Sequence, residues 1–374
     1  MHRTHRYRQK KHRLSLVLIF FVGFFIGIPI GNLFMSTMTP VWGRLVIAYG
    51  SEKATWMNRV QVEFTKWWNE NYPEQPIKTD FTAYGSVQSL IGILNGEIKP
   101  VIWSPAASVW IPQFNTRWQA LSKGPIIIEN ITKIIFSPVV IATWASFNET
   151  YNIKGLSTLQ ALIKNNPGLV KLAHTDPGLS NSGFMAFTMA IATALGKDMK
   201  DITYADLTNA TLQNWLREFE SAAVQYGEST GWLGKMMINS GPSVINVILV
   251  YENVVKDISN KYPGERIIAI YPEEGTLYSD HPFCILNASW VSANDRFIAH
   301  KFVEFIQRPD IVEKAMENGF RPVDTLGIPL NPAYFNYQKY GISPTFSSPE
   351  LHVPEDGNVL IRVPDVWSLT RSVF

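Results

Sequence analysis

The stretch from Ala293 to Val323 reads ANDRFIAHKFVEFIQRPDIVEKAMENGFRPV. Apolar side chains at helical spacing predict an amphipathic helix in its first half, and they are Ile298, Phe302, Phe305 and Ile306. Pro309 ends this helix, and Gly319 and Pro322 close the turn after a second one. The pattern predicts a helix, a short break, a second helix and a closing GFRPV sequence. A generic surface helix with a Gly/Pro stop is the alternative if the rest of the chain does not agree.

The composition is that of a folded protein with room for two lobes or domains. The 374 residues are 46% hydrophobic and 13% aromatic, which is enough for a large core. The formal net charge of +2 is misleading, because the first 13 residues hold six basic side chains and no acid. Without them, 27 basic residues stand against 31 acidic ones. The sequence has no basic stripe of the kind that indicates nucleic-acid binding.

The N-terminal segment has the pattern of a membrane anchor. A basic head, residues 1–13, precedes a charge-free, largely apolar run of 22 residues, 14–35. A helix needs about 20 residues to span a bilayer, so we expect the head in the cytoplasm and everything after Ser36 outside. Cleaved signal peptides usually have an apolar region of about 7 to 15 residues followed by a cleavage site with small side chains, and the residues after this run form a poor cleavage site. The sequence favours a single-pass cell-membrane protein, and a secreted protein with a cleaved segment is the alternative.

Strands that alternate with helices define the fold class as α/β. We expect strands at 44–49, 77–82, 101–103 and 170–173, each followed by a loop and a helix. Ser51 and Ser104 are expected to cap helices, with Pro105 as a first helical residue, and Gly196 is expected as a C-cap. This alternation predicts mostly parallel sheets with right-handed crossovers, with ligands beyond the C-terminal strand ends.

Two apolar stretches, 134–144 and 283–291, are predicted to cross between two lobes near Val139 and Asn287. Lobe 1 is then discontinuous, comprising 44–138 and 287–374, and lobe 2 is inserted at 139–286. The Pro-rich segment from Gly327 to Phe374 is expected to pack on the first lobe.

The candidate ligand site is the set of polar residues in the strand-to-helix loops. The predicted ligand-binding residues are Ser51, Ser86, Ser104, Ser108, Ser180, Asn181, Ser182, Tyr251 and Glu252. Hydroxyl and amide groups beside free N–H groups at helix N-termini suit an oxyanion or a carboxylate. Each such residue is equally able to act only as a helix cap. Glu252 would repel an anion and attract a cationic or hydroxyl-rich ligand, so the charge of the ligand stays open.

Together these motifs resemble the bacterial and archaeal extracellular solute-binding proteins of the two-lobed type II kind. The resemblance rests on VIAYGSEK at 46–53, PVIWSP at 100–105, HTDP at 174–177 and GFRP at 319–322. Within that family, the sequence is similar above all to the branch associated with von Willebrand factor A domain proteins, although no such domain is visible in the chain. The resemblance implies a periplasmic-binding-protein-like clamshell with a hinge, here with an N-terminal transmembrane helix. It also places the loop serines and Tyr251 or Glu252 near the cleft.

Enzyme and metal hypotheses have weaker support. His174, Asp176 and Ser182 supply the residue types of a hydrolase triad, but the surrounding sequence GLSNSG does not match G-x-S-x-G. The histidines lack any metal-ligand spacing. Cys284 is the only cysteine, which excludes an intramolecular disulfide, a cysteine metal cluster and a lipid anchor.

The sequence therefore predicts a non-enzymatic extracellular solute-binding protein without a cofactor or metal. It is expected to capture a small molecule or ion between its lobes and to deliver it to an ABC-type permease. A membrane-anchored sensor or interaction module of the same fold, with a von Willebrand factor A domain protein as partner, is the first alternative, and a hydrolase is the second.

Overall fold

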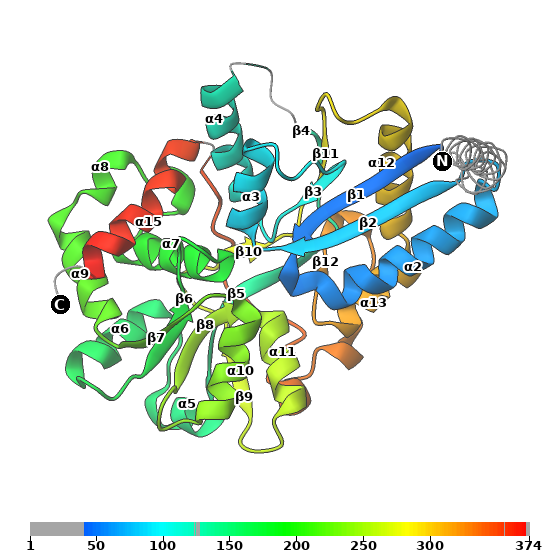
Figure 1. Ribbon diagram of the computed structural model, residues 1–374. Helices are drawn as coiled ribbons and strands as arrows, with labels where there is room; N and C mark the ends of the chain where they lie inside the picture. The colour runs from blue at the N-terminus through cyan, green and yellow to red at the C-terminus, as the bar shows by residue number, and fades with distance from the viewer. Residues whose placement is uncertain (1–40, 123, 125–127, 355, 372–374) are drawn as a thin grey trace, which may run out of the picture.

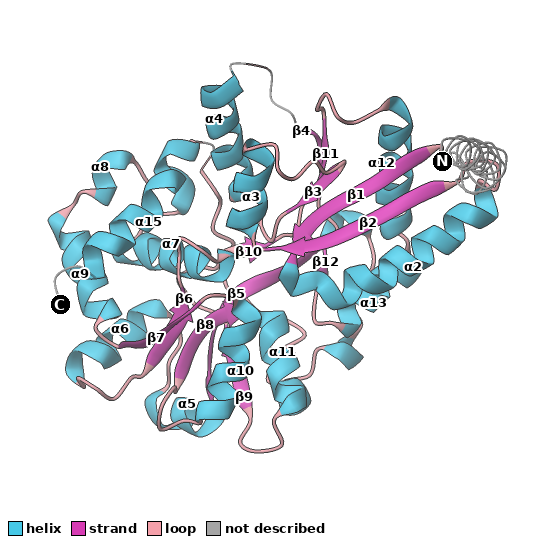
Figure 2. Ribbon diagram, viewed as in Figure 1, coloured by secondary structure: helices cyan, strands magenta, loops and turns pink. Residues whose placement is uncertain are grey.

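The computed structural model describes residues 41–122, 124, 128–354 and 356–371 (Figure 1). In this part of the chain, helices flank two separate sheets, which confirms the α/β class (Figure 2). None of the helices described there is both long and apolar enough to cross a membrane. The predicted basic head and apolar run lie outside the described residues. We call the five-stranded sheet with its helices lobe 1, and the seven-stranded sheet with its helices lobe 2.

Lobe 1 is built on a five-stranded sheet with the order β2-β1-β3-β11-β4. Its strands are β1 (Gly43–Gly50), β2 (Ile77–Tyr84), β3 (Ile102–Ser104), β4 (Ile128–Thr132) and β11 (Phe283–Leu286). Its helices are α2 (Ala54–Asn71), α3 (Ser86–Leu94), α4 (Trp110–Ser122), α12 (Ala293–Ile306) and α13 (Pro309–Glu317). Strand β1 is parallel to β2 and β3, whereas β11 is antiparallel to β3 and β4. The parallel part corresponds to the strand-loop-helix units expected from the sequence.

Lobe 2 is built on the order β10-β5-β8-β6-β7, with β9 and β12 also paired to β5. Its strands are β5 (Ile135–Trp144), β6 (Leu172–Thr175), β7 (Ala223–Gly227), β8 (Val247–Tyr251), β9 (Ile267–Ile270), β10 (Tyr278–Ser279) and β12 (Arg321–Pro322). Its helices are α5 (Ala145–Tyr151), α6 (Leu156–Asn165), α7 (Asn181–Leu195), α8 (Tyr204–Leu207), α9 (Ala210–Glu220), α10 (Thr230–Ser240) and α11 (Glu252–Lys261). Strand β6 is parallel to β7 and β8, so their C-terminal ends lie at one edge.

Two helix starts differ from the sequence expectation. Gly50, not Ser51, stands at the N-cap position, and Ser51 opens a short 3-10 helix, Ser51–Lys53, ahead of α2. Ser104 ends β3, and the next helix starts only at Trp110. Ser104 therefore belongs to a fully buried strand, and its hydroxyl is not a helix cap. Gly196 does end α7 in the left-handed conformation, as predicted.

The predicted closing element is confirmed. Helix α12 begins with a capping box of Ser292 and Asp295, and Pro309 is the first residue of α13. The predicted apolar face of α12 is buried, and Phe302 meets Phe64 of α2 edge-on with ring centroids 5.1 Å apart. Gly319 has φ +85°, and a Cβ there would lie 3.0 Å from Asn253 Cα, so the turn requires glycine.

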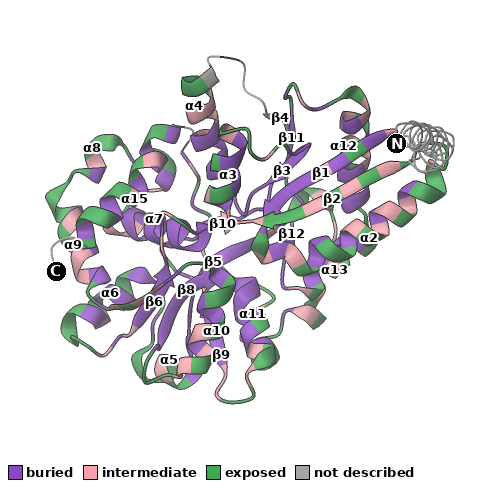
Figure 3. Cartoon of the chain, viewed as in Figure 1, coloured by how far each residue is buried: buried purple, intermediate pink, exposed green. Residues whose placement is uncertain are grey.

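The chain crosses between the sheets before β5 and again between Ser279 and Phe283. Strand β5 already belongs to the second sheet at Val139, whereas β11 lies wholly in the first sheet. The second crossing therefore precedes the expected Asn287. The stretch that begins at Phe283 is apolar because β11 is a central strand of lobe 1 and is buried along its length (Figure 3).

The C-terminal segment contacts both lobes, although we expected it on the first alone. Helix α14 (Tyr337–Tyr340) contacts α11 and β9 in lobe 2. Helix α15 (Gly357–Arg371) then contacts α4 of lobe 1 and α7, α8 and α9 of lobe 2 (Figure 1). At its start, a Cβ on Gly357 would lie 2.5 Å from Pro112 O, so α15 and α4 approach closely.

Candidate functional site

The candidate site lies where the strand ends of the two lobes face each other. In lobe 1, β1, β2 and β3 end together, since Gly50 pairs with Tyr84 and Tyr49 with Ser104. In lobe 2, β6 and β7 end together at Thr175 and Gly227, and Tyr251 ends β8. The loops after these strands carry the residues predicted from the sequence.

The four lobe 1 serines have four different environments. Ser86 is buried, and its Oγ accepts a hydrogen bond of 3.1 Å from Ala106 N. Ser104 is fully buried, and its Oγ has no hydrogen-bond partner among the described residues. Ser108 donates from N and Oγ to Asp280, at 2.7 and 2.6 Å. Ser51 is exposed and makes no side-chain cap.

The lobe 2 residues form a network of paired polar groups. Ser182 Oγ lies 2.8 Å from Thr175 Oγ1 and 2.7 Å from Thr230 Oγ1. Asn181 donates from Nδ2 to the Tyr251 hydroxyl at 2.5 Å. Ser180 is buried and precedes α7 without a side-chain cap. The hydroxyls of this network are therefore satisfied within the lobe.

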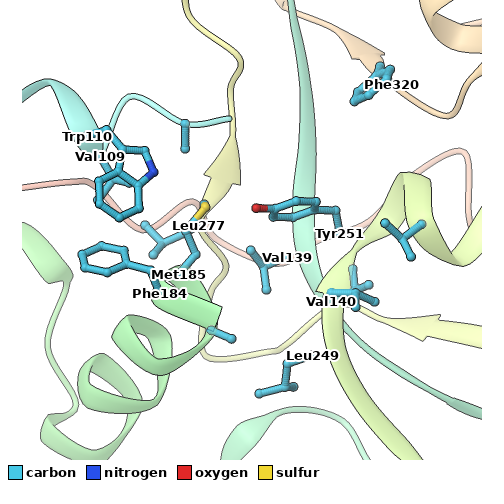
Figure 4. Packing of buried hydrophobic residues seen from close by; sticks show 14 of the residues in the cluster. Val109, Trp110, Val139, Val140, Phe184, Met185, Leu249, Tyr251, Leu277 and Phe320 are labelled. Atoms are coloured by element: carbon cyan, nitrogen blue, oxygen red, sulfur yellow. The ribbon is translucent and has the colours of Figure 1, made fainter. Parts of the chain in front are cut away.

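Asn181 also joins the two lobes directly. Trp110 of α4 donates from Nε1 to Asn181 Oδ1 at 2.5 Å. Its indole packs on Phe184 of α7 with ring centroids 4.8 Å apart (Figure 4). Since α4 belongs to lobe 1 and α7 to lobe 2, the described structure has the lobes in contact.

Glu252 is engaged by the closing element. Its carboxylate accepts from Arg321 Nε at 2.7 Å and from Arg321 Nη2 at 2.6 Å, and it also accepts from the Tyr271 hydroxyl. The side chain of Glu252 is fully buried. This bidentate pair ties the start of α11 to β12, and it leaves Glu252 committed to the fold.

Glu52, Lys53 and His281 form a second buried charged group near the strand ends of lobe 1. Lys53 Nζ donates to Ser104 O at 2.9 Å and Pro105 O at 3.2 Å, and it lies 3.4 Å from His281 Nδ1. Glu52 Oε1 lies 3.5 Å from Lys53 Nζ and 3.3 Å from His281 Nδ1.

The charges of this group are set by burial and by mutual contact. Burial alone would raise the pKa of Glu52, but the charge of Lys53 and contacts with His281 outweigh it and lower that pKa to about 2. Burial lowers the pKa of Lys53 to about 8 against the attraction of Glu52. Burial and the charge of Lys53 lower the pKa of His281. At neutral pH, Glu52 is ionised and His281 is neutral.

A cavity of about 510 Å³ lies along the second crossing, and its lining includes Ser108, Lys133, Asp280 and Glu350. Lys133 Nζ lies 2.6 Å from Asp280 Oδ2, which also accepts from Ser108. The carboxylate of Asp280 is thus paired before any ligand arrives.

The predicted hydrolase triad is not assembled. His174 Nδ1 lies 2.8 Å from Thr175 O, and Nε2 lies 3.0 Å from Glu220 Oε1. Both ring nitrogens are therefore engaged, while the partners of Ser182 are threonines. In the part of the chain that the structure describes, no group of three or more His, Cys, Asp or Glu residues could hold a metal ion.

Residues 45–321 match the sequence model of a family described as bacterial extracellular solute-binding protein. The chain belongs to this family. A search of curated proteins found no match.

Solved structures of solute-binding proteins share its fold. Iron-bound HitA from Pseudomonas aeruginosa is 13% identical, with a TM-score of 0.60, 89% of this chain covered and 100% of HitA. AfuA from Actinobacillus pleuropneumoniae, with fructose-6-phosphate bound, is 16% identical, with a TM-score of 0.57 and coverage of 89% and 99%. An ABC transporter structure from Clostridium perfringens ATCC 13124 is 15% identical, with a TM-score of 0.58 and coverage of 87% and 99%. The comparisons give no support to a von Willebrand factor A association.

Sequence reasoning missed three residues of this solute-binding protein's site region, namely Glu52, Lys53 and His281. Glu52 and Lys53 stand in the SEK sequence that contributed to the resemblance, but an acid beside a base at a helix start usually lies in solvent. The signal was their position directly after a buried strand. His281 comes from the second crossing, 228 residues from Lys53, so no local pattern links the two.

Proposed function

We propose that this solute-binding protein captures a small ligand between its lobes and delivers it to an ABC-type transporter in the membrane. The observation that carries the proposal is the meeting of the strand ends of both sheets, where Trp110 contacts Asn181 across the lobes. Strand ends of parallel α/β sheets are where ligands bind in such folds. The lobes would open and close about the two crossings, at β5 and between Ser279 and Phe283.

The fold by itself does not select the charge of the ligand. An iron-bound protein and a fructose-6-phosphate-bound protein both share it. The ligand of this chain has to be argued from its own residues. The predicted site serines are proposed as the rim of the cleft, with Ser104 facing the ligand because its buried hydroxyl is unpaired.

We also propose that the apolar run, residues 14–35, holds the binding domain outside the cell membrane. The support is its length, its lack of charge and the basic head before it. N-terminal sequencing of protein from its native host should recover the head, whereas a mature start near residue 37 would contradict the anchor.

Lobe closure can be measured in the full chain by fluorescence energy transfer between one label on each lobe. Val62 of α2 and Val244 of lobe 2 are exposed and suit cysteine labelling, while Cys284 is buried and should stay unlabelled. Removal of the co-purified ligand should lengthen the distance between the labels, and its return should restore the short distance. A distance that ignores ligand would contradict capture by closure.

A variant at the contact between the lobes tests the same closure. Trp110→Phe keeps the ring on Phe184 but removes the N–H that reaches Asn181. It should shift the ligand-free population towards the longer distance, because a buried hydrogen bond contributes about 1 kcal/mol.

A further inference from the structure

Glu52 occupies the place where a helix would receive an anion. The N-terminus of a helix favours negative charge, because its first N–H groups are unpaired and the peptide dipoles align. Here the carboxylate of Glu52 folds back over the chain, and a Cβ on Gly50 would lie 2.2 Å from Glu52 Oε1. The carboxylate also accepts a hydrogen bond from its own backbone N–H. The start of the 3-10 helix and α2 thus has an internal anion.

One oxygen of this carboxylate has only long contacts, at 3.3 Å to His281 Nδ1 and 3.5 Å to Lys53 Nζ. Glu52 Oε1 is buried, and it has no hydrogen-bond partner among the described residues. The side chain as a whole is only 10% exposed. A buried carboxylate oxygen without a hydrogen-bond donor is energetically unfavourable. Such an atom at a ligand cleft indicates a group that is to be supplied from outside.

The neighbouring side chains do not supply it, because their protons are directed elsewhere. Lys53 Nζ donates to Ser104 O and Pro105 O and faces His281 Nδ1 at 3.4 Å. Ser279 Oγ donates to Ala106 O at 2.7 Å and lies 3.5 Å from His281 Nε2. His281 Nδ1 lies 3.3 Å from Glu52 Oε1, a contact at ion-pair distance that does not have the geometry of a hydrogen bond.

A second unpaired group lies at the end of β3, the strand that pairs with β1. Ser104 is fully buried, its Oγ has no partner, and its carbonyl receives Lys53. Across the cleft, the Tyr251 hydroxyl accepts from Asn181 at 2.5 Å. Burial and then the charge of Glu52 raise the pKa of Tyr251, so its hydroxyl stays protonated and Glu52 acts across the lobes.

We propose that the ligand presents a hydrogen-bond donor, a hydroxyl or a protonated amine, to Glu52 Oε1 and Ser104 Oγ, and that Glu52 excludes oxyanions. The inference rests on the proposed capture between the lobes and names the chemistry of what is captured. The fixed carboxylate would repel an oxyanion at the same helix start, whereas it attracts a donor. Lys53 Nζ, 3.5 Å from Glu52 Oε1, offsets part of this repulsion, so the exclusion is tested by the change in oxyanion binding when Glu52 alone is removed.

The test is a gain of oxyanion binding when the internal anion is removed. Full-chain wild type and Glu52→Ala are titrated with sodium molybdate and with inorganic phosphate by calorimetry. The shorter side chain frees the helix start, so the variant should bind at least one of these oxyanions tenfold or more tightly than the wild type. Glu70→Gln, at an exposed acid of α2, is the matched control and should behave as the wild type.

Tight oxyanion binding by the wild type would overturn the inference while leaving capture between the lobes intact. Absence of any gain in Glu52→Ala would also overturn it. Glu52→Gln preserves the shape of the side chain and serves if Glu52→Ala does not fold. Glucose, which carries hydroxyls, and spermidine, which carries protonated amines, then separate the two kinds of donor. The compound that raises the Tm of the wild type should raise the Tm of Glu52→Gln much less. An equal rise in Glu52→Gln would contradict the role of Glu52.

Discussion

Two buried acids, Glu52 in lobe 1 and Glu252 in lobe 2, stand at similar places. Glu252 is the first residue of α11, directly after β8, and Glu52 is the second residue of the 3-10 helix that follows β1. Glu252 receives both arms of Arg321 and the Tyr271 hydroxyl. Glu52 has a charged neighbour in Lys53, yet its Oε1 has no donor. A similar local position therefore builds the fold in one lobe and leaves an unpaired acceptor in the other.

The difference lies in what the rest of the chain brings to each acid. Arg321 belongs to the GFRPV closing element, and β12 places it against β5 and the start of α11. Lys53 donates to two backbone carbonyls, and both Lys53 Nζ and His281 Nδ1 reach Glu52 Oε1 only at 3.5 and 3.3 Å. Polar groups at strand ends are thus of two kinds, paired ones that hold the fold and unpaired ones that we propose to bind the ligand.

The largest effect is expected from breaking the paired acid. Arg321→Met leaves Glu252 buried without its counter-ion, so the free energy of unfolding should fall by about 3 to 5 kcal/mol. Urea unfolding followed by circular dichroism measures it. The double variant Arg321→Met/Glu252→Gln removes the stranded charge and should recover a large part of the loss. A loss below about 1 kcal/mol in the single variant would contradict a structural role for the pair.

The two buried serines sharpen the comparison at a smaller scale. Ser182→Ala leaves two threonine hydroxyls short of a partner and should reduce the free energy of unfolding by about 1 to 3 kcal/mol. Ser104→Ala removes an unpaired hydroxyl and should leave the free energy of unfolding nearly unchanged or slightly raised. Equal losses in both variants, measured by urea unfolding, would show that the Ser104 hydroxyl is paired in solution.

A third buried acid, Glu220, predicts a pH dependence. Burial alone would lower the pKa of His174, but the charge of Glu220 outweighs it and holds that pKa above its ordinary 6.5. The stabilisation from His174 is therefore complete below pH 6.5, and it is lost as the pH rises through the raised pKa. The pKa of Glu220 is lowered, so its own contribution is lost only as the pH falls below 4.5.

Thermal unfolding from pH 5 to pH 9 tests this dependence. The Tm of the wild type should fall above pH 6.5. The Tm of His174→Gln should be lower than that of the wild type at pH 6, and it should change less with pH. An unchanged pH profile in His174→Gln would show that His174 is not the group that titrates.

Local patterns were sufficient for much of the fold. Strands β1 and β2 and the α12–α13 pair were predicted from alternation, helical spacing, and the Pro309 and Gly319 signals. The second crossing was misplaced because an apolar central strand and an apolar hinge look alike in sequence. Ser104 was taken for a helix cap because Ser-Pro often starts a helix, whereas tertiary contacts extend the buried strand to that residue.

The candidate site was only partly predictable. Ser182, Asn181 and Tyr251 were predicted from their positions at strand ends, and the structure pairs Asn181 with Tyr251 and Ser182 with Thr175 and Thr230. The roles of Glu52 and Glu252 depend on His281 and Arg321, which come from distant parts of the chain. Periodicity and spacing report local structure, so they cannot tell a paired carboxylate from an unpaired one.

Native mass spectrometry of the full-length protein, released gently from detergent after purification from its native host, tests the central claim most directly. We predict a bound small molecule in the wild type that dissociates on unfolding, carries hydroxyl or amine groups, and is lost or greatly reduced in Glu52→Gln but retained in Glu70→Gln. A bound oxyanion, or a ligand retained equally in Glu52→Gln, would contradict the account.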